Sequence, residues 1–206
     1  DIMAWASRSK QTFTATNATN VLNATAHGLS NGDRVMVTTS ITTSNPTTRF
    51  DGATNYLTDS TGMIPDGKEF TFSALIDLND DTIGVIIANT GYHLHIGKFA
   101  NGTIEVLVRT AANGQLGSIT TADTLTVADG PTMLTVAVNL ATLTMQVRIG
   151  TAAVSAQTVT QTITDGTIDM AAALFSIGAY ENNATTSNYL NADIGRLWLT
   201  DEYMDI

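Results

Sequence analysis

Residues 69–78 read E-F-T-F-S-A-L-I-D-L, with apolar side chains at every even position and polar ones at every odd position except Leu75. A period of two places alternate side chains on opposite faces of a β-strand. The same period continues in L-T-V-A-V-N-L, residues 134–140, and in L-T-M-Q-V-R-I, residues 143–149. Strands with one apolar and one polar face are typical of antiparallel sheets that are buried on one side only.

Turn signals separate these segments at short intervals. Seven Asx-Gly pairs, which favour tight turns because they tolerate positive φ, occur at residues 31–32, 51–52, 66–67, 101–102, 113–114, 129–130 and 165–166. Many short strands with such spacing predict an all-β, two-sheet antiparallel sandwich. The only helical turn that we expect lies between Asp169 and Phe175. Near the C-terminus, Leu190 to Ile194 and Leu197 to Leu199 alternate in different phases, which predicts a β-bulge at Gly195.

Composition excludes several classes of function. The 206 residues are 43% hydrophobic but only 14% charged, and the net charge is -10. Such an acidic chain repels phosphate backbones and anionic membranes, so we expect neither nucleic acid nor a membrane as a partner. No apolar run approaches the length of a transmembrane helix, and the absence of cysteine rules out disulfides and thiolate chemistry.

A change in composition near Pro46 predicts two parts. Residues 1–46, rich in Thr and Asn, form an N-terminal β-rich arm or small β motif, and residues 47–206 form the sandwich. The arm is too short for a core of its own, and the whole chain has only three lysines to protect its sheet edges. We therefore expect a homo-oligomer in which the arm and its Trp5 pack on a neighbouring copy.

Five segments from residue 47 onward resemble, in order, the strands of laminin-G-like, concanavalin A-like jelly rolls. They are R-F-D-G-A-T-N-Y-L-T (49–58), E-F-T-F-S-A-L-I-D-L (69–78), T-M-L-T-V-A-V-N-L with L-T-M-Q-V-R-I-G (132–150), F-S-I-G-A-Y (175–180) and N-Y-L-N-A-D-I-G-R-L-W-L-T-D (188–201). The Trp-His pair frequent after the central Asp-Gly in that family is replaced by Thr132-Met133. That replacement puts an inherited glycan site in doubt.

A second segment, A-T-A-H-G-L-S-N-G-D-R-V at residues 24–35, is similar to a short β-motif of bacteriophage tail and other virion proteins. This resemblance implies a non-enzymatic structural or adhesion component of a virion. Its partners would be other virion proteins, copies of itself and host-surface glycans. The alternative is a carbohydrate-binding module of a secreted or cell-surface protein, with an extracellular location.

The glucanases that share the concanavalin A-like fold show which residues catalysis would need. Those enzymes place their acid and nucleophile on one strand as alternating carboxylates. This chain has only Glu69, Glu105, Glu181 and Glu202, and no two lie within six residues of each other. We therefore predict no catalytic residue and no enzymatic activity.

Three further groups of residues are candidate binding sites. His93 and His95 share one face if they lie on a strand, which could begin a metal site, but the only other histidine is His27. The clusters Asn79-Asp80-Asp81 and Asp201-Glu202 offer the oxygen ligands that Ca²⁺ needs, although solvated turns explain both. Tyr56, Tyr180, Tyr189 and Trp198 could stack on sugars or pack at the rim of the core. We predict no metal site and no cofactor, with Ca²⁺ as the one open alternative.

Overall fold

The computed structural model describes residues 14–16, 21–23, 47–60, 63–171, 174–182 and 185–206. The chain divides into two compact units, Asp1–Thr42 and Thr43–Ile206. In the first unit, β1 (Thr14–Thr16) pairs with β2 (Val21–Asn23) in an antiparallel hairpin. Pro46, where the sequence predicts a boundary, lies outside the described residues, as do Trp5 and His27, so that boundary stays a prediction.

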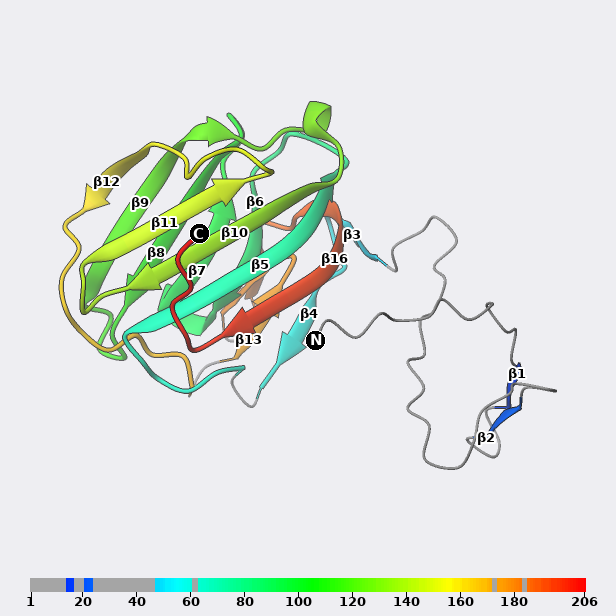
Figure 1. Ribbon diagram of the computed structural model, residues 1–206, viewed down its shortest axis with the longest axis horizontal. Coiled ribbons are helices and arrows are strands. Elements are labelled where there is room, and N and C mark those ends of the chain that lie inside the picture. Colours follow the sequence, from blue (N-terminus) through cyan, green and yellow to red (C-terminus); the bar gives the residue numbers. More distant parts are fainter. Residues whose placement is uncertain (1–13, 17–20, 24–46, 61–62, 172–173, 183–184) are drawn as a thin grey trace, which may run out of the picture. The chain divides into compact units, whose positions relative to one another are not determined.

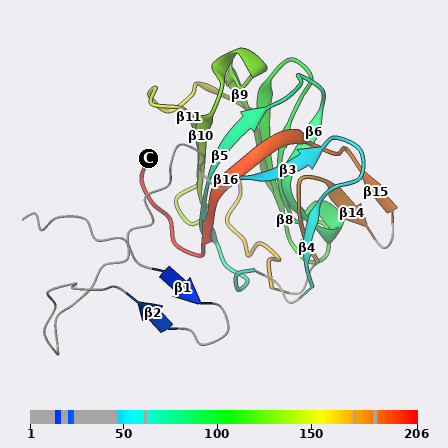
Figure 2. The ribbon, with the colours of Figure 1, turned by 90° about the vertical axis from the view of Figure 1, so that its right-hand side faces the viewer.

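The second unit is a sandwich of two antiparallel sheets (Figures 1 and 2). The five-stranded sheet has the order β11-β10-β5-β16-β3. Its strands are β3 (Thr48–Asp51), β5 (Glu69–Leu78), β10 (Thr132–Asn139), β11 (Thr144–Ile149) and β16 (Asn191–Thr200). The prediction of an all-β, two-sheet antiparallel sandwich is confirmed.

The seven-stranded sheet has the order β12-β9-β8-β7-β6-β13-β4. Its strands are β4 (Leu57–Asp59), β6 (Gly84–Asn89), β7 (Leu94–Lys98), β8 (Thr103–Arg109), β9 (Gln115–Thr124), β12 (Gln157–Gln161) and β13 (Phe175–Ile177). A separate hairpin of β14 (Tyr180–Asn182) and β15 (Thr185–Ser187) packs through β14 against β6. The 3₁₀ turns η1 (Thr90–Tyr92) and η2 (Val127–Asp129) complete the unit.

The core lies between the two sheets and follows the alternation in the sequence. In β5, the side chains at even positions from Phe70 to Leu78 are buried in the main apolar cluster. Strand β8 supplies Ile104, Val106 and Val108 to the same cluster from the other sheet. The odd positions of both strands therefore face away from the core, and these outward faces are where a binding site can form.

The bulge expected at Gly195 is present. Gly195 pairs with Leu75 and Trp198 pairs with Ser73, so three steps on β16 match two on β5. Arg196, inside the bulge, has a φ of 50°. The extra residue turns Leu197 and Leu199 toward the core, where both pack.

One predicted core position is wrong. Leu143 is 52% exposed and has a φ of 56°, because it closes the turn between β10 and β11 instead of starting the strand. Its amide donates to the carbonyl of Leu140 at 3.3 Å. The period-two pattern matched Leu143 by coincidence, since the hairpin turn occupies those positions.

The Asx-Gly pairs divide into two groups. Gly52, Gly102, Asn113 and Gly130 adopt positive φ in turns, as expected. The pairs at residues 66–67 and 165–166 do not: the Asp66 carboxylate accepts the amide of Met170 at 2.7 Å, and Asp165 lies 2.8 Å from the Lys68 ammonium. These two pairs join loops that are distant in sequence. The Asx-Gly pair at residues 31–32 lies outside the described residues.

Two further expectations concern helices. Residues 169–171 and 174–175, which the structure describes, are not helical, and Phe175 begins β13, so the helical turn predicted there is wrong for those positions. In the part of the chain that the structure describes, no helix has both the length and the apolar character needed to cross a membrane.

Candidate functional site

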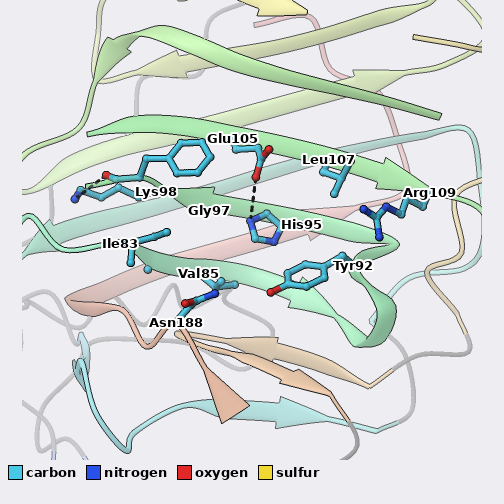
Figure 3. A pocket seen from close by; sticks show the side chains of 12 residues that line it. Ile83, Val85, Tyr92, His95, Gly97, Lys98, Glu105, Leu107, Arg109 and Asn188 are labelled. Carbon is cyan, nitrogen blue, oxygen red and sulfur yellow. Dashed lines mark hydrogen bonds and ion pairs between the residues drawn. The ribbon is translucent and has the colours of Figure 1, made fainter. Parts of the chain in front are cut away.

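A pocket of about 270 Å³ lies on the outward face of the seven-stranded sheet (Figure 3). Strand β8 contributes Glu105, Leu107 and Arg109, the outward positions that alternate with its three core residues. In the register, His95 of β7 pairs with Leu107, and Gly97 pairs with Glu105. The alternation that buries one face of β7 and β8 thus gathers these side chains on the other face.

One end of the pocket is formed by Tyr92. Gly91 and Tyr92 both have positive φ, and the side chain of Tyr92 lines the pocket. The ring of Tyr92 stacks on that of Tyr180 with centroids 3.6 Å apart and planes inclined by 15°. Asn188, which follows the β14–β15 hairpin, also lines the pocket. At the other end, Ile83 and Phe99 lie partly exposed, so the pocket has an aromatic wall and an apolar rim.

His95 lies inside the pocket with only 8% of its surface exposed. Its ring occupies the space above Gly97, where a Cβ would overlap the imidazole Nε2. The same Nε2 lies 3.8 Å from the Glu105 carboxylate, and Nδ1 is buried without a hydrogen-bond partner. Glycine at position 97 is therefore a condition for this placement of His95.

The charges of the pocket influence one another. Burial, reinforced by the Arg109 charge, lowers the pKa of His95 from 6.5 to about 4. Burial raises the pKa of Glu105, and the Arg109 charge opposes that shift. Burial also raises the pKa of Tyr92, as does the neighbouring Tyr180. At neutral pH the pocket therefore presents a neutral imidazole, a carboxylate and a guanidinium, together with the Lys98 ammonium, which donates to the carbonyls of Thr82 and Phe99.

His93 takes no part in this arrangement. It precedes β7, and its Nδ1 lies 2.8 Å from a carboxylate oxygen of Asp169 while its Nε2 lies 3.1 Å from the side-chain oxygen of Asn113. His93 thus joins three loops, whereas His95 faces Glu105. Within the described residues, no group of three or more His, Asp or Glu side chains could hold a metal ion.

The acidic segment at residues 79–81 forms a turn that lies near the positively charged side chain of Lys98. The Asp80 carboxylate accepts the hydroxyl of Thr82 at 2.6 Å and the amide of Asn191 at 2.7 Å. Burial opposes the lowering of the Asp80 pKa, but these hydrogen bonds and the charge of Lys98 outweigh it. The ammonium of the buried Lys98 donates to the carbonyl of Thr82 at 3.0 Å. These contacts match the turn expected at this cluster, and the absence of Ca²⁺ stays a prediction.

The glutamates are dispersed. Glu69 faces outward from the five-stranded sheet and accepts the amide of Asn139 at 2.8 Å, whereas Glu105 lies on the other sheet. Glu202 is exposed next to Asp201, and Glu181 lies in β14. Among the glutamates whose side chains the structure describes, no two line one pocket.

The four aromatic residues considered for sugar stacking occupy different places. Tyr56 and Tyr189 contact each other edge to face, with centroids 6.0 Å apart. Trp198 is 45% exposed on β16 of the five-stranded sheet. Only Tyr180 borders the pocket, where it supports Tyr92. Sequence analysis missed Tyr92, Arg109 and Asn188; the one available signal was the outward phase shared by Glu105, Leu107 and Arg109.

Comparison with known proteins identifies the fold but no family. No protein-family model matches the chain, and no curated protein matches it in sequence. Among solved structures, a SAP-like pentraxin from Limulus polyphemus matches with a TM-score of 0.58 and 14% identity over 76% of each chain. Domains LG4-5 of the mouse laminin α1 chain match with a TM-score of 0.53 and 16% identity, over 74% of this chain and 40% of that one.

A third similar structure is the CBM40 module of Ruminococcus gnavus IT-sialidase bound to α2,3-sialyllactose. The TM-score is 0.53 at 10% identity, over 74% of this chain and 92% of the module. These similarities support the predicted laminin-G-like, concanavalin A-like jelly roll. None of the three is a virion protein, so the virion origin stays a prediction.

Proposed function

We propose that the chain is a non-catalytic carbohydrate-binding module and that the pocket on the seven-stranded sheet takes a single sugar residue. The observation that carries the proposal is the pocket itself, which is lined by the aromatic Tyr92, the carboxylate of Glu105 and the guanidinium of Arg109. Tyr180 covers one face of the Tyr92 ring and the His95 ring lies 4.9 Å from it, so the remaining ring surface offers apolar contact to a sugar. Charged side chains hydrogen-bond to the hydroxyl groups of a sugar. The volume, about 270 Å³, is at the low end for small-molecule sites, which favours one ring over a long chain.

Two further points support this function. A similar fold, the CBM40 module of the Ruminococcus gnavus sialidase, is solved with a sialylated sugar bound. The pocket lining includes one carboxylate, Glu105, whereas most glycosidases need a pair about 5–10 Å apart. The pocket therefore suits binding better than hydrolysis.

A glycan array followed by calorimetry on the best ligand tests the proposal. Glu105→Gln should weaken binding about tenfold or more, because a charged hydrogen-bond acceptor is lost while the shape is kept. Glu69→Gln, a matched change on the outward face of the other sheet, should leave the affinity unchanged. Binding to no glycan, or equal loss in the two variants, would refute the proposal.

A further inference from the structure

Arg109 has few partners within the protein. Its Nη1 donates to the carbonyl of Gly91 at the long distance of 3.4 Å, and its Nε is buried without a hydrogen-bond partner. Among the described residues, Arg49 pairs with Asp193 and Lys68 with Asp165, and two histidine–carboxylate contacts join His93 to Asp169 and His95 to Glu105. Arg109 belongs to none of them, so its charge is available to a ligand.

An unpaired guanidinium in a partly buried pocket is unfavourable unless something compensates it. A buried donor without an acceptor loses its hydration and gains no hydrogen bond in return. The neighbours of Arg109 compensate its charge only in part: His95 is neutral at pH 7, and the Glu105 carboxylate interacts with the Arg109 charge without forming an ion pair with it. The planar guanidinium presents several donors in a fork that matches the two oxygens of a carboxylate.

The strand also fixes where such a carboxylate would lie. Glu105 and Arg109 are four residues apart on β8 and point to the same face, so their Cα atoms are separated by about 13 Å. Leu107 lies between them, and the ring of His95 and the bare backbone of Gly97 flank it from β7. The pocket thus has the donor Arg109 at one end near Tyr92, the acceptor Glu105 beside the His95 ring, and Ile83, Lys98 and Phe99 toward the other end (Figure 3).

We infer that the sugar bound by this pocket is an acidic one, with its carboxylate on Arg109 and its hydroxyl groups directed to Glu105. This inference rests on the proposed function and adds the chemical class and the orientation of the ligand. Glu105 repels a carboxylate from its own side of the pocket, and the Lys98 ammonium already donates to the carbonyls of Thr82 and Phe99, so Arg109 is the favoured partner of the carboxylate.

The test compares carboxylated sugars with neutral counterparts. Glycosides of glucuronic, galacturonic and N-acetylneuraminic acid are titrated against the intact protein beside the same sugars with the carboxyl group reduced to an alcohol. At least one acid should bind about ten to one hundred times more tightly than its reduced form, and added NaCl should narrow the difference. This comparison needs no variant, so it decides the question even if a substitution prevents folding.

Variants then assign the preference to Arg109. Arg109→Gln should bind the acid and its reduced form about equally, whereas Arg109→Lys should keep part of the preference. Arg148→Gln is the matched control, because Arg148 faces outward from the five-stranded sheet and its Nε is likewise buried without a partner. The control should behave like the unmodified protein.

The outcomes separate the two proposals. Neutral or sulfated glycans that bind as well as the acids, with Arg109→Gln unchanged, would overturn the acidic ligand and leave the carbohydrate-binding function standing. Binding to no glycan would overturn both.

Discussion

His95 should make the stability of the protein depend on pH between about 6.5 and 4. Burial in the pocket, together with the Arg109 charge, lowers its pKa from 6.5 to about 4 in the folded chain. Between those values an unfolded chain binds a proton at this position and the folded chain does not. The stability is therefore complete above pH 6.5 and is lost as the pH falls toward 4.

The size of the effect follows from the two pKa values. Each tenfold change in proton affinity is worth about 1.4 kcal/mol, so a fall from 6.5 to about 4 corresponds to a loss of ~3 kcal/mol. Glu105 acts in the opposite sense: its raised pKa makes the folded chain bind a proton more tightly than the unfolded one. The observed loss should therefore be somewhat smaller than His95 alone would give.

Urea unfolding at pH 7, 6, 5 and 4 measures this directly. His95→Gln, which cannot titrate, should flatten the dependence over that window, whereas Glu105→Gln should make it steeper because the opposing contribution is removed. Other titrating groups are common to all three proteins and cancel in the differences. Equal pH dependence in the original chain and in His95→Gln would show that His95 is not buried as a neutral group.

Three further changes test the fold and the assembly. Leu143→Asn should raise the free energy of unfolding by about 0.5–1 kcal/mol, measured in urea, because Asn tolerates the φ of 56° better than the exposed leucine does. Gly178→Ala should lower the melting temperature strongly, since Gly178 has a φ of 84° and a Cβ there would overlap the Phe50 ring. Gly130→Ala, at a φ of 61° and with no atom within 4 Å of the added Cβ, carries backbone strain without the overlap and should cost less. Deleting residues 1–20 should shift light scattering toward the monomer while circular dichroism of the sandwich persists; a monomeric intact chain would contradict the predicted homo-oligomer.

Much of the fold could be predicted because a strand that buries only one face has apolar and polar residues in alternation. Residues Phe70 to Leu78 show the pattern. The bulge at Gly195 was also visible, as a change of phase, because Ile194 before it and Leu197 after it both pack in the core. The prediction failed at Leu143, where a turn interrupted a pattern that apolar residues happened to continue. Local periodicity records which face is buried but not where a strand stops.

The candidate site was harder to predict because it depends on register. The outward phase of Glu105 and Arg109 could be read from β8 alone, but their neighbours come from other strands. His95 meets Glu105 only because β7 pairs with β8 in one register, and Tyr92 reaches the pocket through positive φ at two successive residues. Neither the pairing nor the backbone turn has a signature in the sequence that we could have used.

The hydrogen bonds of the two outward faces support placing the site on the seven-stranded sheet. On the five-stranded sheet, the C-terminal segment returns across the strands: the amide of Met204 donates to the Thr71 hydroxyl at 2.9 Å, and the Tyr203 hydroxyl donates to Gln146 at 3.1 Å. Those polar groups are satisfied within the chain, although Arg148 Nε and Asn191 Oδ1 on the same sheet are buried without a partner. On the seven-stranded sheet, His95 Nδ1 and Arg109 Nε are buried and have no partner in the protein. Buried polar groups normally find partners, and His95 and Arg109 line one pocket together whereas Arg148 and Asn191 do not line it, so the seven-stranded sheet is the face that we expect to bind a ligand.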